Sequence, residues 1–481
     1  MAQSPGSGRA RAPGRAPRPW PVVKGRPVAD SRARPAPLAK GGLLGSAADL
    51  LSDPLNTLLE GYHAYGGIVR FRIGPPGSPE IHGVSGPAAL QHILVSNAAN
   101  YRKDDRLYDA VRHVVGDSLL TNQDELWTRQ KKLIHPLFTA RQVNGYVPQM
   151  SALVARMAAR WRRDAPATVD LHAEMNELTL RVLCAVMFGG EAEEIIQVIA
   201  DDWPTVGEAV AHRAFSAVRL PDAWPTPRAR RLAGARRRLF GACDQLIGAR
   251  RGRPAGSRAP DLLDLLLKAT GADGALSDEE VREQLVVFLV GGYDTTATTL
   301  AYAFHHLGSR PGLQRRVKQE AERLPRSGTS LDAAALPDLR YTGMVLKETL
   351  RLYPAAPVFG RNAVRADTVA GVHVPAGAQL LISPWVLHRD PGLWPDPGVF
   401  DPDRFAHGDD EARHSLAWLP FGAGPRLCIG RHFSLAEATV ALATLVREFA
   451  FTCDATALTA PTVRPVLMPT SPMIATISPH P

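Results

Sequence analysis

Cys428 lies in the part of the chain that best suits chemistry, a glycine- and proline-rich loop directly before a helical pattern. A helix N-terminus and a neighbouring cation such as Arg426 both stabilise a thiolate. Gly424 and Gly430 lack a Cβ, so the backbone there can turn sharply and approach a flat ligand closely. Phe421 would add an aromatic wall. The loop therefore predicts a thiolate beside a flat ligand, and the structural alternative is a buried, inert cysteine.

A second group of polar residues lies in the middle of a long predicted helix. Ser277 and Glu280 have the spacing of a capping box, and a proline-free pattern runs from there to Leu307. Two glycines inside a buried helix cost about 2 kcal/mol relative to alanine, and an acid in an apolar stretch is costly to bury. These costs favour a function over a simple helix kink for the central residues, which are Gly291, Gly292, Asp294 and Thr295.

Charged residues further along the chain predict a scaffold for the cysteine loop. Glu348 and Arg351 are three residues apart, so they face the same side of one helix and can pair. Such a pair is common on helices by itself. Here it is followed by Leu352-Tyr353-Pro354 and, later, by a Phe-Asp-Pro-Asp-Arg-Phe stretch that contains Arg404. The combination is more specific than the pair alone.

Together these motifs resemble the cytochrome P-450 family, whose haem loop has the pattern Phe-x-x-Gly-x-Arg-x-Cys-x-Gly. All five fixed positions are met, at Phe421, Gly424, Arg426, Cys428 and Gly430. The resemblance covers residues 41–481. It implies a mostly α fold with a minor β region, built as a single large helical domain. It also implies one haem b, with iron protoporphyrin IX ligated by the Cys428 thiolate.

The resemblance assigns roles around that haem. Gly291 and Gly292 would let the cofactor and a diatomic ligand approach the long helix. Asp294 and Thr295 would form an acid–alcohol pair that delivers protons to dioxygen.

Further residues would hold the cofactor itself. Phe421 and Arg426 belong to the haem loop. Trp127 and Lys131 would bind one haem propionate, with lysine where the family usually has arginine, so that the charge is kept but bidentate contact is lost. Arg361 would also bind a propionate. A solvated basic face and a surface arginine are the respective alternatives.

The same resemblance predicts a structural network and a substrate pocket. Glu348, Arg351 and Arg404 would form a buried network that supports the cysteine loop. The pocket would be lined by Leu119, Phe288, Leu289, Val358, Phe359 and Met473.

The implied reaction is monooxygenation of an apolar small molecule of terpenoid, polyketide or fatty-acid type. The chain has no flavin fingerprint and no cysteine cluster, so the electrons are expected from a separate ferredoxin and an NAD(P)H-driven ferredoxin reductase. That partner is expected to meet a basic face with Arg129, Lys132 and Arg431. A haem-thiolate peroxygenase or isomerase and a non-enzymatic haem-binding sensor are the rival functions.

Composition limits the other possibilities. The net charge is +9, but residues 1–40 hold nine Lys or Arg and one acid, which gives +8 and leaves about +1 for the rest. The charge therefore does not indicate nucleic-acid binding. The 4 cysteines form no Cys-x-x-Cys pair, so a zinc site or a disulfide framework is disfavoured. A monomeric, cytoplasmic bacterial enzyme of specialised metabolism fits this composition.

The sequence also predicts the outline of the fold. Residues 1–40 are proline-rich and basic and are expected to be a disordered extension, with a transit peptide as the alternative. Alternating patterns predict paired strands over 68–73 and 80–84, and an apolar pattern predicts a helix over 171–188. No run of 18 apolar residues is present, so no membrane-spanning helix is expected.

Overall fold

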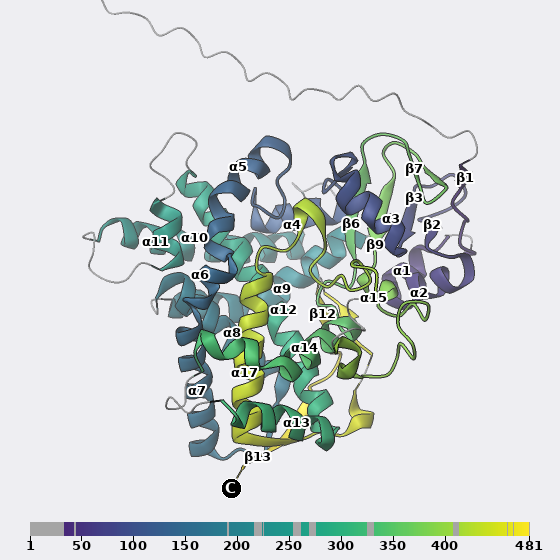
Figure 1. The fold of residues 1–481 in the computed structure, drawn as a ribbon. Helices are drawn as coiled ribbons and strands as arrows, with labels where there is room; N and C mark the ends of the chain where they lie inside the picture. Colours follow the sequence, from purple (N-terminus) through teal and green to yellow (C-terminus); the bar gives the residue numbers. More distant parts are fainter. Residues whose placement is uncertain are drawn as a thin grey trace, which may run out of the picture.

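The structure is a computed structural model that describes residues 33–42, 45–189, 192–215, 224, 226–253, 261–268, 276–324, 331–406, 413–458, 460–464 and 466–480. Helices make up most of it, many of the strands gather on one side, and the last strand lies apart from them, beside the C-terminus (Figure 1). The predicted mostly α fold with a minor β region is confirmed. None of the described helices is long and apolar enough to cross a membrane.

The α-helices follow one another along the chain with short 3-10 turns between some of them. Their bounds are α1 (Ala47–Ser52), α2 (Pro54–Tyr65), α3 (Pro87–Gln91), α4 (Arg106–Val115), α5 (Asp124–Ile134), α6 (Ala140–Asn144), α7 (Val147–Asp164), α8 (Leu171–Phe188), α9 (Glu193–Phe215), α10 (Pro227–Arg251), α11 (Leu262–Lys268), α12 (Asp278–Gly308), α13 (Pro311–Glu322), α14 (Arg340–Leu352), α15 (Pro384–Leu387) and α17 (Arg431–Glu448).

The strands form four small sheets. A five-stranded sheet has the order β2 (Ile68–Arg72), β3 (Glu80–Val84), β9 (Gln379–Ile382), β6 (Phe359–Ala363) and β4 (Tyr101–Arg102). Two three-stranded sheets have the orders β1 (Arg34–Pro35), β8 (Val372–Val374), β7 (Asp367–Val369), and β10 (Phe449–Thr452), β13 (Ile474–Pro479), β5 (Thr168–Asp170). A hairpin joins β11 (Thr462–Val463) and β12 (Leu467–Met468).

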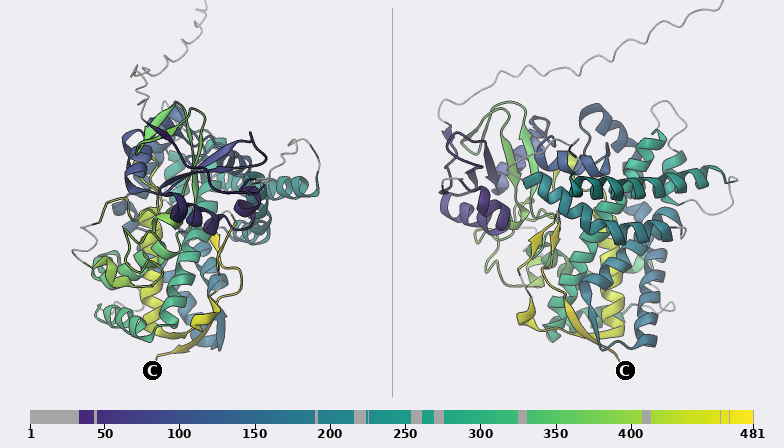
Figure 2. Two further views of the ribbon diagram at one scale, coloured as in Figure 1. Left: turned by 90° about the vertical axis from the view of Figure 1, so that its right-hand side faces the viewer. Right: turned by 180° about the vertical axis from the view of Figure 1, so that it is seen from behind.

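The long helix α12 runs through the middle of the helical part and organises it (Figures 1 and 2). Its start is the predicted capping box, in which the Ser277 side chain accepts from the Glu280 N–H and the Glu280 carboxylate accepts from the Ser277 N–H. Every residue from Thr296 to Gly308 is buried, so its second half is core on all sides. Helix α8 packs along it and coincides with the helix predicted over 171–188.

The predicted strand pair also forms, with Ile68 opposite Val84 and Arg72 opposite Glu80. Residues 33–40, however, differ from the prediction of a disordered extension. Strand β1 pairs in parallel with β8, and the Ala39 N–H donates to the Arg70 carbonyl at 2.8 Å. A backbone that fills its hydrogen bonds on a sheet is ordered whatever its proline content. The rest of the predicted extension, residues 1–32, lies outside the described residues.

Candidate functional site

The cysteine loop presents Cys428 at the start of α17. The Cys428 N–H donates to the Phe421 carbonyl at 2.9 Å, which closes the loop. The Cys428 side chain is accessible although protein surrounds it, so it borders an internal space. Burial raises the pKa of the thiol, while the backbone N–H groups of Gly430 and Arg431 and the cation of Lys103 oppose that rise. A positive centre bound to the sulfur would reverse this balance and favour the thiolate.

Gly424 is required by a close approach between two chain segments. Its φ is +66°, and a Cβ there would lie 1.9 Å from the Leu94 carbonyl oxygen. Leu94 belongs to a π-helical turn, His92–Ser96. A Cβ on Gly430 would meet only Cys428 Sγ at 4.0 Å, an ordinary contact. The prediction that both glycines admit a flat ligand is therefore corrected for Gly424, which lets the loop pack on its neighbour.

Three cations meet beside Cys428. Lys103 and Arg361 are 8% and 5% exposed. Burial, then Arg361 and Arg426, lower the pKa of Lys103 well below its usual range, and burial followed by Arg361 lowers the pKa of Arg426 to about 10. Two acids act on these cations, Asp124 and Asp105, which caps α4 through the Leu107 and Tyr108 N–H groups. Two acids against three cations leave an excess of positive charge that suits an anionic ligand.

Helix α5 adds an aromatic ring to this group. The Arg426 guanidinium lies 3.9 Å from the centre of the Trp127 ring, and Lys131 Nζ lies 4.9 Å from the same centre. Lys131 also donates to the Pro425 carbonyl at 2.7 Å. The structure thus places Trp127 and Lys131 on one side of α5, the side that their spacing predicts, adds Arg426 to them, and gives Lys131 a second contact on the cysteine loop.

The two glycines of α12 face different surroundings. A Cβ on Gly291 would meet nothing within 4 Å, whereas a Cβ on Gly292 would lie 2.8 Å from Leu183 Cδ2 of α8. Gly291 therefore borders open space, and its role as a cofactor-facing residue stays a prediction. Gly292 does not, and this prediction is corrected: its missing side chain lets α12 pack against α8.

Asp294 and Thr295 do not bond to each other in the described part of the chain. Thr295 Oγ1 donates to the Gly291 carbonyl at 2.9 Å. Asp294 is 1% exposed, and its Oδ2 accepts from Trp203 Nε1 of α9 at 3.0 Å. Burial raises the pKa of Asp294, and the Trp203 N–H and His172 oppose that rise. The predicted acid–alcohol pair is adjacent in sequence, but its members point to different partners.

The scaffold network is assembled. Arg351 makes two bonds to the Glu348 carboxylate, at 2.6 and 2.7 Å, and both side chains are fully buried. Arg351 also donates to three carbonyls, those of His388, Pro397 and Val399. Arg404 Nε lies 3.5 Å from Glu348 Oε1. Glu348 and Arg351 are paired and bonded, and Arg404 adds a longer contact to Glu348, which lowers the penalty for burying these charges.

Four of the six predicted pocket residues lie near the open side of α12 or at the start of β6. Phe288 lies one turn before Gly291 and so shares its side of α12, while Leu119 donates its N–H to Gln284 Oε1 on the same helix. Val358 and Phe359 lie before and at the start of β6.

Leu289 is corrected, because it is fully buried two residues from Gly291, on the opposite side of the helix. Met473 stays a prediction. Its backbone bonds to Asp170 and Leu171 at the β5–α8 junction.

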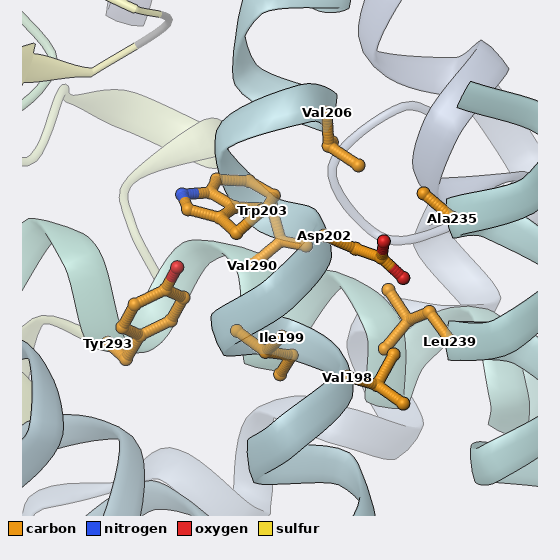
Figure 3. Close-up of a pocket in the computed structure, with 9 residues that line it drawn as sticks. All are labelled: Val198, Ile199, Asp202, Trp203, Val206, Ala235, Leu239, Val290 and Tyr293. Atoms are coloured by element: carbon orange, nitrogen blue, oxygen red, sulfur yellow. The ribbon is translucent and has the colours of Figure 1, made fainter. Parts of the chain in front are cut away.

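The sequence did not predict the two residues that lie beside Asp294, Trp203 and His172, or the buried Lys103 among the cations. Trp203 and His172 lie far before Asp294 in the sequence, and neither belongs to a recognisable motif. Trp203 also borders a small apolar pocket between α9, α10 and α12, together with Val198, Ile199, Leu239 and Val290 (Figure 3). Lys103 belongs to no motif. In the sequence it is one lysine in a short segment of mixed charges.

Comparison with known proteins identifies the class of this site. The sequence profile of the Cytochrome P450 family matches residues 37–477. Cyclooctatin synthase of Streptomyces melanosporofaciens is 32% identical over 414 residues, which cover 85% of this chain and 88% of that protein. Pentalenene oxygenase of Streptomyces avermitilis is 30% identical over 438 residues, 89% and 92% of the two chains. A crystal structure of a cytochrome P450 superposes with a TM-score of 0.80 at 24% identity, over 93% of this chain and 100% of that one.

The chain therefore belongs to the cytochrome P450 family. It is an oxidoreductase of the monooxygenase type, and its cofactor is a haem held through a cysteine thiolate. The residues present fit that group. Cys428 is accessible from an internal space, and the excess of buried cations, Lys103, Arg361 and Arg426, matches the two carboxylates of a haem. Gly291 leaves room on α12.

Proposed function

We propose that this monooxygenase inserts one oxygen atom into an apolar small molecule of the terpenoid class and takes its electrons from a separate ferredoxin. The observation that carries the proposal is the face of α12 with Phe288, Gly291 and Thr295, where an open position lies between an aromatic ring and a hydroxyl group. The names of two relatives, a cyclooctatin synthase and a pentalenene oxygenase, support the substrate class.

The haem, when bound, supplies the oxygen chemistry, in which two electrons and two protons convert dioxygen into one inserted oxygen atom and one water. The chain supplies the rest. Cys428 would hold the iron, and Lys103, Arg361 and Arg426 would hold the carboxylates. Thr295 offers a hydroxyl proton on the open side of α12, and Asp294 stores a proton nearby. Apolar side chains such as Phe288 keep water away from the substrate.

Two rival functions make different demands. A peroxygenase or isomerase needs no electron partner, and a haem-binding sensor needs no turnover. The acid and the alcohol at 294 and 295 favour the monooxygenase, since a proton supply serves dioxygen activation. Product formed with NADPH, ferredoxin and reductase, and not with peroxide alone, would support the proposal. Product with peroxide alone would favour the first rival, and no product with either would favour the sensor.

The site assignment is tested by the spectrum of the reduced protein with carbon monoxide. We expect the red-shifted band of a thiolate-ligated haem, and we expect Cys428→Ala to lose it. Retention of that band in Cys428→Ala would contradict the assignment. Candidate terpenoids are then screened by the shift that each causes in the haem absorption band, with cyclooctatin-type and pentalenene-type hydrocarbons as the first set.

A further inference from the structure

His388 connects the helix of the buried ion pair to the segment that leads into the cysteine loop. It directly follows α15 and is fully buried. Its Nδ1 lies 2.9 Å from the Arg351 carbonyl oxygen, and its Nε2 lies 2.8 Å from the Leu419 backbone nitrogen. The His388 carbonyl in turn accepts from the Arg351 guanidinium at 2.8 Å. The proposed function uses none of these ring contacts.

The two ring contacts fix the state of the imidazole. A carbonyl oxygen only accepts and a backbone N–H only donates, so Nδ1 carries the proton and Nε2 is the acceptor. Burial, followed by the Arg351 guanidinium, lowers the pKa of His388 to about 3, so the ring is neutral in ordinary buffers. A neutral ring with both nitrogens bonded has one orientation, and it therefore holds Leu419 at a defined distance from Arg351.

Further hydrogen bonds continue from Leu419 to the cysteine. The Leu419 carbonyl accepts from the Gly422 N–H at 3.3 Å, and the Phe421 carbonyl accepts from the Cys428 N–H at 2.9 Å. Phe421 directly precedes Gly422, so the backbone joins these two bonds. Every bond after His388 links backbone atoms, which have less freedom than side chains. A displacement of Leu419 is therefore passed on to Cys428.

A second contact anchors the same segment on α14. Trp418 Nε1 donates to the Lys347 carbonyl at 3.1 Å, and the Trp418 ring meets the Phe421 ring edge-on with 6.1 Å between centres. Lys347 and Arg351 are one helical turn apart, so both anchors lie on the same side of α14. The Trp418 bond holds a side chain, whereas the His388 bond holds the backbone itself.

We propose that His388 is a positioning residue that sets the place of the Cys428 sulfur relative to the haem iron, and that it acts through the Leu419 N–H. The ion pair of Glu348 and Arg351 supports α14, and His388 carries that support to the loop. Without the ring, the Leu419 N–H would be buried with no acceptor, and the loop would shift to satisfy it. The inference depends on cysteine ligation of the haem and is independent of the substrate and of the electron donor.

The contact itself is tested in the diamagnetic carbon monoxide complex of the wild-type protein. A hydrogen bond between two nitrogens gives a measurable ¹⁵N–¹⁵N coupling, which we expect between the Leu419 amide and the His388 ring. The chain has 15 histidines, and the signal that disappears in His388→Gln identifies the ring. Absence of the coupling in the wild-type protein would overturn the proposal, whatever the variants do.

The effect on the ligand is measured in the holoenzyme by two spectroscopic properties, the lifetime of the red-shifted carbon monoxide band and the Fe–S stretching frequency in resonance Raman spectra. His388→Phe keeps a flat ring and removes both nitrogens. We expect this variant to lose the band about tenfold faster, the factor that corresponds to one buried hydrogen bond, and to shift the Fe–S frequency. An unchanged lifetime and frequency in His388→Phe would refute the positioning role.

Two amide variants separate the Leu419 bond from the Arg351 bond. A glutamine amide at position 388 reaches the place of Nε2 and keeps an acceptor for the Leu419 N–H, whereas an asparagine amide reaches only the place of Nδ1. We therefore expect His388→Gln to restore both spectroscopic properties toward the wild type and His388→Asn to resemble His388→Phe. Equal values in the two amide variants would contradict the proposal, and this comparison decides the matter if His388→Phe forms no holoenzyme.

His305→Phe is the matched control, because it makes the same change at another buried histidine. His305 is 4% exposed near the end of α12, where the Gly308 carbonyl accepts from the Cys453 N–H at 3.2 Å, beyond the end of α17 that is remote from Cys428. We expect an unchanged Fe–S frequency in this variant even where the fold is less stable. An equal shift in His305→Phe and His388→Phe would show general destabilisation and would overturn the specific role of His388.

Discussion

Glu437 of α17 is a carboxylic acid buried without compensation. It is 1% exposed, and neither of its oxygens has a hydrogen-bond partner among the described residues. Burial alone raises the pKa of Glu437 well above 4.5. The folded protein therefore keeps a proton that the unfolded chain releases as soon as the pH exceeds its ordinary pKa.

This gives a prediction with a definite sign. A raised pKa contributes stability only at low pH, and the unfolding free energy of the native protein falls as the pH rises above about 4.5. Glu437→Gln removes that loss, so its stability advantage in urea unfolding should grow by about 1.4 kcal/mol per pH unit until the folded acid ionises. The exposed Glu60→Gln is the control. An advantage that does not change between pH 5 and pH 7, roughly the window set by ordinary and raised carboxyl pKa values, would contradict the prediction.

Thr295 gives a second prediction at this scale. Its hydroxyl lies on the open side of α12, so Thr295→Ala should keep the haem spectrum and lose product per electron by about tenfold, the factor for one hydrogen bond, with the balance appearing as peroxide. Thr296→Ala is the matched control. The Thr296 hydroxyl bonds to Gly292 and Ser434 instead, and we expect its product yield to stay normal. Equal yields in the two variants would remove Thr295 from the proton path.

Individual residues were predictable where their chemistry is local. Cys428 stands in a continuous loop that resembles the family's haem loop, and Glu348 and Arg351 are one helical turn apart, so that they can pair on one helix face. Trp203 was not predictable, since its contact with Asp294 joins helices α9 and α12 and depends on how they pack. Helical periodicity places Leu289 and Phe288 on different sides of α12, whereas the family resemblance does not distinguish between them.

At the scale of the element, α12 combines an open face and a packed face within one turn. Gly292→Ala gains about 1 kcal/mol of helix propensity and loses about 1–3 kcal/mol to overpacking against the buried Leu183, so we expect a net loss near 1 kcal/mol. Gly291→Ala meets no neighbour, and we expect a gain of about 1 kcal/mol. Urea unfolding of the haem-free protein measures both.

The two glycine variants also differ in how they respond to a second change. Shortening Leu183 to alanine makes room for the new methyl group, so the loss in Gly292→Ala should shrink in the double variant relative to Leu183→Ala alone. The effect of Gly291→Ala should be unaltered by Leu183→Ala. Additive behaviour at both positions would show that Gly292 does not pack against α8 as the structure indicates.

At the scale of the whole molecule, the electron donor is expected to meet a basic face. Arg129 is engaged by an ion pair with Glu280, while Lys132 is exposed on α5 and Arg431 is half-buried at the start of α17. An acidic ferredoxin would be steered by these cations, and the steering fades when the Debye length falls to about 8–10 Å. We expect the reduction rate to fall with salt.

Charge reversal locates the face. Lys132→Glu with Arg431→Glu should slow reduction by an acidic ferredoxin at low salt and have little effect at high salt. Arg315→Glu with Arg323→Glu changes the net charge equally on and after α13, at the opposite end of the molecule from α5 (Figure 1). Stopped-flow reduction that slows equally in both double variants would show that net charge, and no particular face, governs the encounter.

The fold class could be predicted from long, periodic segments, as α8 and the β2–β3 pair show. The pairing of the first strand, β1, could not be predicted. Composition assigned residues 33–40 to an extension, because prolines and arginines read as disorder, yet β1 finds a partner more than 330 residues away, at Arg34 opposite Val372. Local composition carries no information about a partner so distant in the chain.

The sheet of β10, β13 and β5 ties the helix of the cysteine ligand to the helix that carries His172. Strand β10 follows α17 directly, β5 precedes α8 directly, and β13 lies between them, bonded to both. Residues 474–479 therefore have to be synthesised before these two parts can be clamped together. During translation the nascent chain therefore lacks this link between α8 and α17 until a strand of six residues near its end has been made.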